Sequence, residues 1–476
     1  MHFFDFLIFA VYFGIVLYIG FYFYHKNKTR EDYYVGNRSI PYTHVGMSIV
    51  ATDVGGGFSI GLGGLGFLIG LSGSWLLFTG LVGAWLSAIL VIPRIKKIDS
   101  KEGMLTFPDF LRYHYNGRVA TAAAIISGIG YLGFTGGQIL AGAKLAAGTI
   151  FINVSFMDPI QLSLYIMTAV VIIYTVLGGL KAVIYTDTFQ WIILLGGLLF
   201  FGIPFAYFEV GGWQTMQQQL PSEFLTLSNI TVVQFVNWFF TIVPIWFVAM
   251  TLYQRIFACA DVKSARKAFY IAGILEYPLM AFIGVFLGMI ARIFYPFADA
   301  EMGMPMLLKN VLPVGVRGIV IAAYFSAILS TADSCLLASS GNFVNDIVER
   351  LLRKKHSHKT MIRLSQVITF IIGGTTFIIA QSFATVLEII LHAYSFMVSG
   401  LLVPTLAAYF FKRKDSTAAF TSMFGGGTLT LWLIFSKTQT PLGLDASVFG
   451  ILFSALLFIM VTFISKNLKK REHFHV

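Results

Sequence analysis

The sequence predicts an all-α polytopic membrane protein with about thirteen transmembrane helices. Hydrophobic residues make up 57% of the 476 residues, and charged residues make up only 12%. Apolar runs of about 20 residues recur along the chain, and each is long enough to cross about 30 Å of hydrocarbon as a helix. No segment between the runs is long enough for a soluble domain. The predicted spans cover residues 3–24, 42–70, 74–95, 119–151, 159–177, 185–208, 231–253, 268–295, 316–340, 361–381, 384–411, 417–436 and 446–465.

Signals of other protein classes are absent. The first apolar run, residues 3–24, lacks a basic segment before it and a small-residue cleavage site, so we expect a retained span rather than a signal peptide. Cys259 and Cys335 lie in or near predicted spans and indicate no disulfide framework. The sequence contains no H-E-x-x-H or paired-cysteine motif, and we therefore expect no enzymatic activity.

The basic residues predict the orientation of the chain. If the N-terminus is outside, the inner loops are residues 25–41, 96–118, 254–267, 341–360, 412–416 and the C-terminal tail. Only five of the 33 Lys and Arg residues then face the outer side, namely Lys144, Arg292, Lys309, Arg317 and Lys437. Because cytoplasmic loops carry an excess of Lys and Arg, we predict a plasma (inner) membrane protein with its C-terminus in the cytoplasm. The net charge of +11 thus reflects topology, and we expect no nucleic-acid partner.

Two predicted spans contain residues that interrupt helices. Three consecutive glycines, Gly55–Gly57, lie in the second span just after Asp53 and Val54, and each costs about 1 kcal/mol relative to alanine in a helix. Pro244 lies in the seventh span, five spans later. Taken singly, the glycines can serve close helix packing and Pro244 a kink. As a matched pair they predict two inverted repeats around a binding site at the bilayer midplane.

This pattern divides the single membrane transport domain, residues 1–476, into four parts. Spans 2–6 and 7–11 form the two repeats, the first span is an addition, and the last two spans are an extension. The parts are an N-terminal helix and inner loop (1–41), a first five-helix repeat (42–230), a second repeat (231–411), and the C-terminal helices and tail (412–476).

Polar residues line one face of the ninth span. Ala327, Ser330, Thr331 and Ser334 follow i, i+3, i+4, i+7 spacing, so a carbonyl and three hydroxyl groups can converge, and Asp333 lies beside them. An Asp in the middle of a membrane costs about 2.5–3.5 kcal/mol, which makes a functional role the default interpretation. A small hard cation coordinated by oxygens is the ligand that this stripe suits.

Four segments, in the expected order, resemble the sodium:solute symporter family, which includes sodium-coupled carriers of sugars, proline, pantothenate, choline and sialic acid. They are Glu31–Pro41, the glycine-rich Ser48–Ser59, Gly178–Gln190 (GGLKAVIYTDTFQ) and Ser326–Asp346. The resemblance implies a leucine-transporter-like bundle of discontinuous helices that works by alternating access.

The resemblance also implies the ligands of a sodium ion. The family site matches the backbone carbonyls of Ala51 and Val54 on the broken second span. On the ninth span it matches the carbonyl of Ala327 and the hydroxyls of Ser330 and Thr331, the same residues that the spacing selects. Carbonyl and hydroxyl oxygens can replace the hydration shell of a monovalent cation. The alternative role for the two hydroxyls is hydrogen bonding to the preceding helical turn.

A second group of residues matches a further sodium site that some family members have nearer the inside. Asp187, Asp333 and Ser334 stand at or beside its positions. Asp333 departs from the two-ion pattern, which offers a hydroxyl there. Asp187 could instead act on the exit route of the ion or cap its helix. The residues thus indicate either a second sodium site or an exit route.

By the same resemblance, a solute pocket lies between the broken spans and spans 4 and 11. Gly57 and Phe58 occupy positions where sugar carriers have long amide and acidic side chains, which disfavours a sugar. Aromatic faces with a carboxylate suit a small amino acid or a quaternary ammonium through cation–π attraction. The candidate residues are Asp53, Gly56, Gly57, Phe58, Phe134, Gln138, Trp246 and His392.

We therefore expect a sodium-coupled symporter that imports a small organic solute, with Na+, the solute and the lipid bilayer as its partners. The oligomeric state is left open, and a monomer is compatible with this function. Two alternatives remain. One is a proton-coupled carrier of the same fold, with Asp53, Asp187 or Asp333 as the titrating site. The other is a solute-sensing membrane module that acts with a separate signalling partner.

Overall fold

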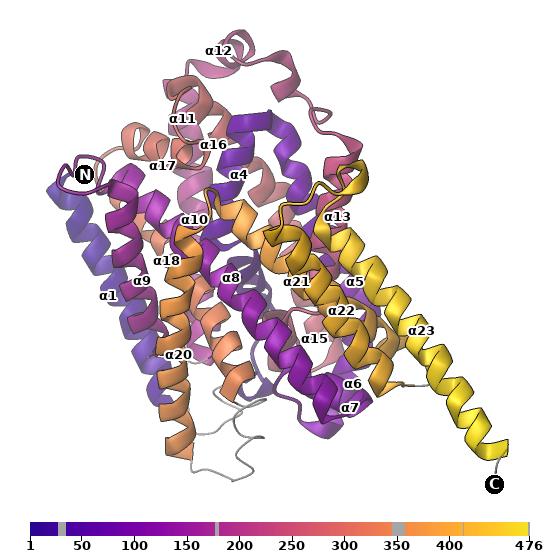
Figure 1. Ribbon diagram of the computed structural model, residues 1–476. Helices are drawn as coiled ribbons and strands as arrows, with labels where there is room; N and C mark the ends of the chain where they lie inside the picture. The colour runs from indigo at the N-terminus through magenta and orange to yellow at the C-terminus, as the bar shows by residue number, and fades with distance from the viewer. Residues whose placement is uncertain (27–34, 177–179, 345–357, 413, 475–476) are drawn as a thin grey trace.

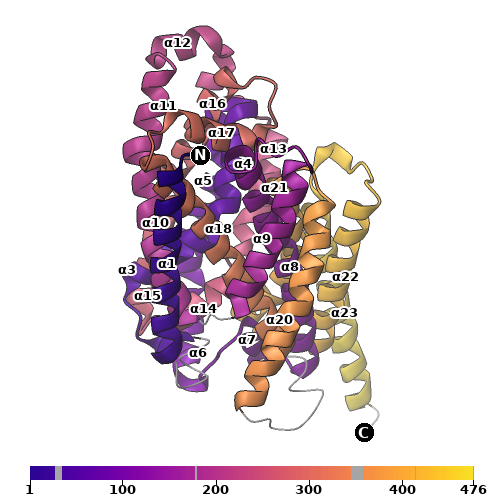
Figure 2. The same cartoon turned by 90° about the vertical axis from the view of Figure 1, so that its left-hand side faces the viewer.

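The computed structural model describes residues 1–26, 35–176, 180–344, 358–412 and 414–474, and all regular structure in these ranges is helical (Figure 1). The predicted all-α class is therefore confirmed. Each of the thirteen predicted runs coincides with one helix or with two consecutive helices. Figures 1 and 2 place the two ends of the chain at opposite ends of the bundle, as an odd number of crossings requires.

The helices in the first half of the chain are α1 (Phe3–Lys26), α3 (Tyr42–Asp53), α4 (Gly55–Ile69), α5 (Trp75–Leu90), α6 (Ile92–Glu102), α7 (Phe107–His114), α8 (Gly117–Thr149), α9 (Pro159–Val176), α10 (Leu180–Gly197), α11 (Ile203–Glu209) and α12 (Gly212–Gln219). Those in the second half are α13 (Val232–Ile245), α14 (Met250–Ala258), α15 (Val262–Ile274), α16 (Ala281–Phe294), α17 (Ala300–Val311), α18 (Val316–Gly341), α20 (His358–Gln381), α21 (Val386–Phe410), α22 (Ser416–Phe435) and α23 (Ala446–Phe474).

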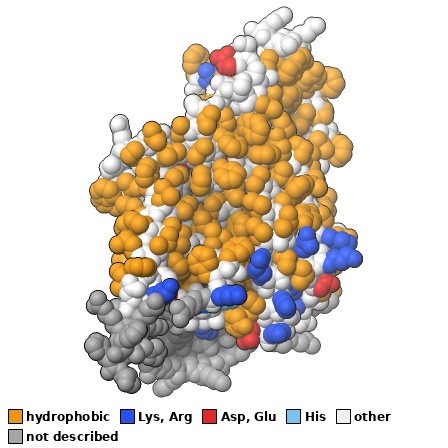
Figure 3. All heavy atoms as spheres, turned by 90° about the vertical axis from the view of Figure 1, so that its right-hand side faces the viewer, with side chains coloured by type: hydrophobic (Ala, Val, Ile, Leu, Met, Phe, Trp, Pro, Cys, Tyr) orange, Lys and Arg blue, Asp and Glu red, His pale blue; other side chains and the backbone are white. Residues whose placement is uncertain are grey.

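Eight continuous helical segments of the described chain are long and apolar enough to cross a membrane, and nine are if α13 and α14 count as one bent span. Shorter apolar helices cover Phe3–Ile19, Pro159–Ile173 and Gln366–Gln381. The protein is thus a multi-pass membrane protein, while the number of thirteen crossings stays a prediction. Figure 3 shows the corresponding surface: a broad belt of apolar side chains with basic side chains gathered near its lower edge.

Both predicted interruptions lie where the sequence placed them. The second span divides into α3 and α4 at Gly55, whose φ of 44° is readily adopted by a residue without a Cβ. The seventh span divides into α13 and α14, which meet at an angle of 45° just after Pro244. Because a proline removes a backbone donor and clashes with the preceding turn, it favours a break at this point.

A third interruption was missed by the sequence analysis. The predicted span 268–295 consists of α15 and α16, joined by a segment of wider helical turn at Leu275–Met280. Tyr277 in this segment is extended, with φ −135° and ψ 125°. It precedes Pro278, and a residue before proline is pushed away from the helical region. The signal was therefore present as a single proline within an otherwise continuous apolar run.

The centre of the bundle is α18. All of its residues from Val320 to Gly341 are buried, and it packs against α8, α10, α4 and α3. A membrane helix that is surrounded by protein can carry polar groups, because neighbouring helices rather than lipid meet them. The hydroxyl stripe of the predicted ninth span therefore faces protein.

The contact between α4 and α16 depends on glycine. A Cβ on Gly288 would lie 2.0 Å from the carbonyl oxygen of Gly63, which is backbone and has little freedom to move. We expect Gly288→Ala to lower the free energy of unfolding by about 1–3 kcal/mol, the usual cost of overpacking. Gly14→Ala is the matched control, because a Cβ there has no neighbour within 4 Å. Thermal unfolding in detergent measures both variants, and equal melting temperatures would contradict the packing argument.

Candidate functional site

The hydroxyl of Thr331 links α18 to the end of α3. Its Oγ1 lies 2.8 Å from the carbonyl oxygen of Ala51 and 2.9 Å from that of Ala327. The hydroxyl of Ser330 donates to the same Ala327 carbonyl at 3.2 Å. Gly55 permits this approach, since a Cβ there would lie 2.3 Å from the Thr331 Oγ1. Four of the predicted sodium ligands therefore lie together at the break of the second span.

A small cavity adjoins these oxygens. Its volume is about 10 Å³, enough for one water-sized guest. The three residues whose carbonyls were predicted to bind sodium, Ala51, Val54 and Ala327, all line it. The other lining residues are Val50, Gly55, Gln190, Trp191, Leu194 and Met280. The hydroxyls of Ser330 and Thr331 bond to the preceding turn, as the alternative predicted, and Thr331 bridges to α3 as well.

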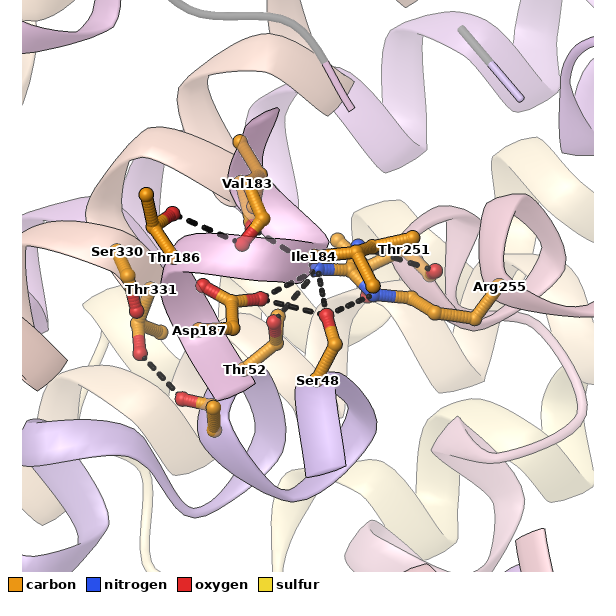
Figure 4. A network of polar contacts seen from close by, with 12 residues as sticks. Ser48, Thr52, Val183, Ile184, Thr186, Asp187, Thr251, Arg255, Ser330 and Thr331 are labelled. Carbon is orange, nitrogen blue, oxygen red and sulfur yellow. Dashed lines mark hydrogen bonds and ion pairs between the residues drawn. The ribbon is translucent and has the colours of Figure 1, made fainter. Parts of the chain in front are cut away.

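On the last two turns of α3, which carry Ser48 and Thr52, a buried arginine joins four helices (Figure 4). Arg255 of α14 is fully buried, and its Nη2 lies 2.7 Å from the Thr52 hydroxyl and 3.4 Å from the Asp187 carboxylate. The same nitrogen donates to Ser334 of α18 at 3.0 Å. Ser48 of α3 donates to Asp187 at 2.5 Å. Arg255 belongs to the predicted inner loop 254–267, whereas in the structure it lies in the protein interior.

This network contains two of the three residues of the predicted second sodium site. Asp187 and Ser334 both contact Arg255. No hydrogen bond joins Asp333 to the network within the described ranges, and its Oδ1 has no donor there. A guanidinium group therefore already supplies the positive charge beside Asp187.

Aromatic rings surround the carboxyl group of Asp53. The Tyr394 hydroxyl donates to the Asp53 Oδ1 at 3.0 Å. The rings of Phe134 and Tyr394 stack with centroids 5.2 Å apart, and Phe58 lies 6.1 Å from Tyr394. The Gln138 side chain accepts a hydrogen bond from the backbone of Gly57 at 3.0 Å. Five of the eight predicted pocket residues therefore lie in one cluster that joins α3, α4, α8 and α21.

The other three predicted pocket residues have different surroundings. Gly56 faces α18, where a Cβ would lie 1.8 Å from Ile328, so it serves close packing. Trp246 packs edge-on against Phe269 and is fully buried. His392 is half-buried, with its Nε2 3.9 Å from a carboxylate oxygen of Glu388. No ring contact or hydrogen bond among the described residues joins Trp246 or His392 to the Asp53 cluster.

A second carboxyl group lies beside Asp53. Glu276, in the segment between α15 and α16, is fully buried, and among the described residues its oxygens have no polar partner other than the Asp53 carboxyl group. Gly80 of α5 leaves room for it, because a Cβ there would lie 2.5 Å from the Glu276 Oε2. Neither carboxyl group forms an ion pair with a Lys or Arg within the described part of the chain.

Comparison with known proteins now decides the family. The sequence model of the sodium:solute symporter family matches residues 33–426. The chain belongs to this family. The high-affinity proline transporter PutP of Bacillus subtilis is 27% identical over 464 residues, covering 93% of this chain and 96% of PutP. Sodium/glucose cotransporter 4 of Mus musculus is 27% identical over 93% of this chain and 71% of its own length.

Solved structures give the fold of this family member. The outward-open, substrate-bound state of a Na+-coupled sialic acid symporter matches with a TM-score of 0.76 at 19% identity, and 98% of each chain is covered. The nucleobase-cation-symport-1 transporter Mhp1 matches with a TM-score of 0.59 at 14% identity, over 92% of this chain and 96% of Mhp1. The predicted leucine-transporter-like fold is thereby confirmed, and membership of the family supports sodium-coupled transport.

Three residues at the centre of this symporter were missed by the sequence analysis. Glu276 is the only carboxylate in its apolar run, and that isolation was the signal. Arg255 resembled a topology-determining charge because it lies at the edge of a basic loop. Tyr394 carried no signal, because an aromatic residue in an apolar span is usually a packing residue. It lies two positions after His392, which the analysis chose from the same span.

Proposed function

We propose that this protein is a sodium-coupled symporter that imports a small, positively charged or zwitterionic organic solute by alternating access. The observation that carries the proposal is the Thr331 hydroxyl, which joins the carbonyls of Ala51 and Ala327 beside a cavity of atomic size. A sodium ion in that cavity would take its ligands from both α3 and α18. It would therefore stabilise the conformation in which these two helices are together.

Sodium supplies the driving force in this mechanism. One sodium ion that enters at a membrane potential of −100 mV gains about 2.3 kcal/mol electrically, before its concentration gradient is counted. Ion binding holds α3 against α18 and favours the outward-open state. Solute binding then permits closure, and both are released to the inside. The proposed orientation has the N-terminus outside and the C-terminus in the cytoplasm of a plasma (inner) membrane.

The Arg255 network would control the inner exit route. Its guanidinium connects α14, the second half of one broken span, to α3, the first half of the other. Release of sodium to the inside would require these halves to separate. Because Arg255 already neutralises Asp187, we assign Asp187 and Ser334 to the exit route rather than to a second sodium site. Asp333 stays a candidate for either role.

The solute class follows from the Asp53 cluster. Two buried carboxyl groups that have no basic partner among the described residues favour a cationic ligand, and the rings of Phe58, Phe134 and Tyr394 offer faces that attract cations. Gly57 stands where sugar carriers have a long polar side chain, so this position offers no partner for the hydroxyls of a sugar. Two Bacillus subtilis relatives are named as proline transporters, and proline carries a secondary ammonium group. An amino acid or a quaternary ammonium compound is therefore the proposed solute.

A double substitution in α18 tests the sodium site. Ser330→Ala with Thr331→Ala removes two proposed ligands and should raise the half-saturating sodium concentration about tenfold or more, the cost of one or two contacts to a charged group. The measurement is the sodium dependence of melting temperature and of uptake into proteoliposomes. Ser326→Ala is the control, since this hydroxyl is also buried in α18 and is not a proposed ligand. Unchanged sodium dependence in the double variant would remove the ligand assignment.

The solute itself can be found by a thermal-shift screen. Purified protein is tested against amino acids, betaines, sugars and carboxylates, with and without sodium. We expect a cationic or zwitterionic compound to raise the melting temperature only when sodium is present. A stabilising sugar or dicarboxylate would contradict the proposed solute class.

A proton-coupled carrier of the same fold is the second candidate, and the pair of Asp53 and Glu276 favours it. Two adjacent buried carboxyl groups can share one proton, and their protonation can then follow the transport cycle. Solute uptake in acidic, sodium-free medium that is lost in Glu276→Gln would support this mechanism over sodium coupling.

A further inference from the structure

A side chain on α10 reaches the same cavity as the proposed sodium ligands. Gln190 lines the cavity with Ala51, Val54 and Ala327, and it is only 1% exposed. Neither its amide oxygen nor its amide nitrogen has a hydrogen-bond partner among the described residues. A buried polar group without a partner is costly and rare, so the Gln190 amide calls for a partner from outside the described residues.

The position of Gln190 on α10 explains why it points at the cavity. Asp187, Gln190 and Leu194 follow i, i+3, i+7 spacing and share one helical face. Asp187 contacts Ser48 of α3, and Leu194 lines the cavity together with Gln190. Gln190 is therefore one turn further along α10 than the Arg255 network, at the level of the break in the second span.

We propose that the side-chain oxygen of Gln190 is a sixth sodium ligand, contributed by a third helix. This inference rests on the proposed function, because it assumes that sodium enters the cavity. An amide oxygen carries the same dipole as the backbone carbonyls of Ala51 and Ala327, so it adds a neutral ligand. The ion would then join α10 to α3 and α18, and its binding would give the Gln190 side chain the partner that it lacks among the described residues.

The chemistry of the cavity supports an oxygen ligand from Gln190. Apart from Gln190, the cavity is lined by backbone and by the side chains of Val50, Ala51, Val54, Trp191, Leu194, Met280 and Ala327, none of which carries an oxygen. Among the described residues that line the cavity, Gln190 is thus the only one with a side-chain oxygen. Its removal should weaken sodium binding without removing any contact between α3 and α18.

The test uses the full-length protein and sodium chloride alone, with choline chloride keeping the ionic strength constant. The sodium dependence of the melting temperature is measured for the wild type, Gln190→Leu, Gln190→Asn and Gln190→Glu. Leucine removes the side-chain oxygen of Gln190, asparagine carries it on a side chain that is one methylene shorter, and glutamate keeps an oxygen at the same position. Met280→Leu is the matched control, because Met280 lines the same cavity and is also buried.

We expect the half-saturating sodium concentration to rise about tenfold in Gln190→Leu, the loss of one polar contact to a charged group. It should rise in Gln190→Asn, and it should stay at or below the wild-type value in Gln190→Glu and unchanged in Met280→Leu. If Gln190→Leu does not fold, a higher half-saturating sodium concentration in Gln190→Asn without a rise in Gln190→Glu supports the ligand role, and equal values in the two variants contradict it.

Two outcomes distinguish a failure of the Gln190 proposal from a failure of the proposed sodium site. A wild-type sodium response that both Gln190→Leu and Gln190→Asn retain would overturn the role of Gln190 and leave the proposed function standing. A wild-type protein that shows no response to sodium would overturn the sodium site as a whole, and the sixth ligand with it.

Discussion

Replacing Arg255 with methionine should lower the free energy of unfolding by about 3–5 kcal/mol and abolish uptake. Methionine fills a similar volume but leaves the Asp187 carboxylate buried without its positive partner. The substitution also removes the donors to Thr52 and Ser334. Breaking a buried ion pair by removing one partner is costly, because the remaining charge stays out of water.

A double-mutant cycle isolates the charge effect. Asp187→Asn removes the uncompensated charge, so the variant that combines Arg255→Met with Asp187→Asn should recover part of the lost stability. Arg255→Lys keeps the charge, but a single ammonium group cannot reproduce the planar fork that contacts α3, α10 and α18. It should therefore be folded and impaired in transport.

Thermal unfolding and proteoliposome uptake measure these variants. Arg266→Met is the matched control, because Arg266 is only partly buried and contacts Tyr270 of its own helix. We expect it to change stability by about 0.5 kcal/mol or less. An Arg255→Met protein with normal stability and uptake would show that the network does not join the two broken spans.

The fold was predictable from the sequence because a bilayer allows few structures. Backbone groups in hydrocarbon must bond within the segment, so length and hydropathy suffice to locate helices. Gly55 and Pro244 marked two breaks because three glycines in a row and a buried proline disfavour a continuous helix. Pro278 was equally available as a signal, but from residue 268 to residue 291 the apolar run around it continued without a charged residue other than Glu276.

The site was predictable only where its residues lie close together in the sequence. Ser330 and Thr331 lie three and four positions after Ala327 on one helix, so their spacing alone predicted a common site. Arg255, Glu276 and Tyr394 meet the site from three separate segments. Their roles depend on how the helices pack, because their contacts with other helices join residues 68 or more positions apart in the chain, as in the pairs of Arg255 with Asp187 and of Tyr394 with Asp53. A pattern within one segment cannot carry that information.

Replacing Asp53 with asparagine should reduce solute uptake about 100-fold while the sodium titration stays close to that of the wild type. Removing one partner of a buried charge interaction costs about 2–5 kcal/mol, which corresponds to this range of affinity. The Asp53 side chain points to Tyr394 and Glu276, whereas the proposed sodium ligands nearby are the backbone carbonyls of Ala51 and Val54. The two ligands of the carrier should thus be separable by this substitution.

A second variant in the same cluster should show a smaller loss of solute binding than Asp53→Asn. Tyr394→Phe removes only the hydroxyl that bonds to Asp53, and it should weaken solute binding by about tenfold or less. Uptake of the solute identified by the thermal-shift screen, and its stabilising effect, are measured for both variants in saturating sodium. If Asp53→Asn keeps wild-type uptake, the carboxylate does not recognise a cationic solute. If it loses its response to sodium instead, Asp53 belongs to the ion site, and solute recognition must rest on Glu276 and the aromatic rings.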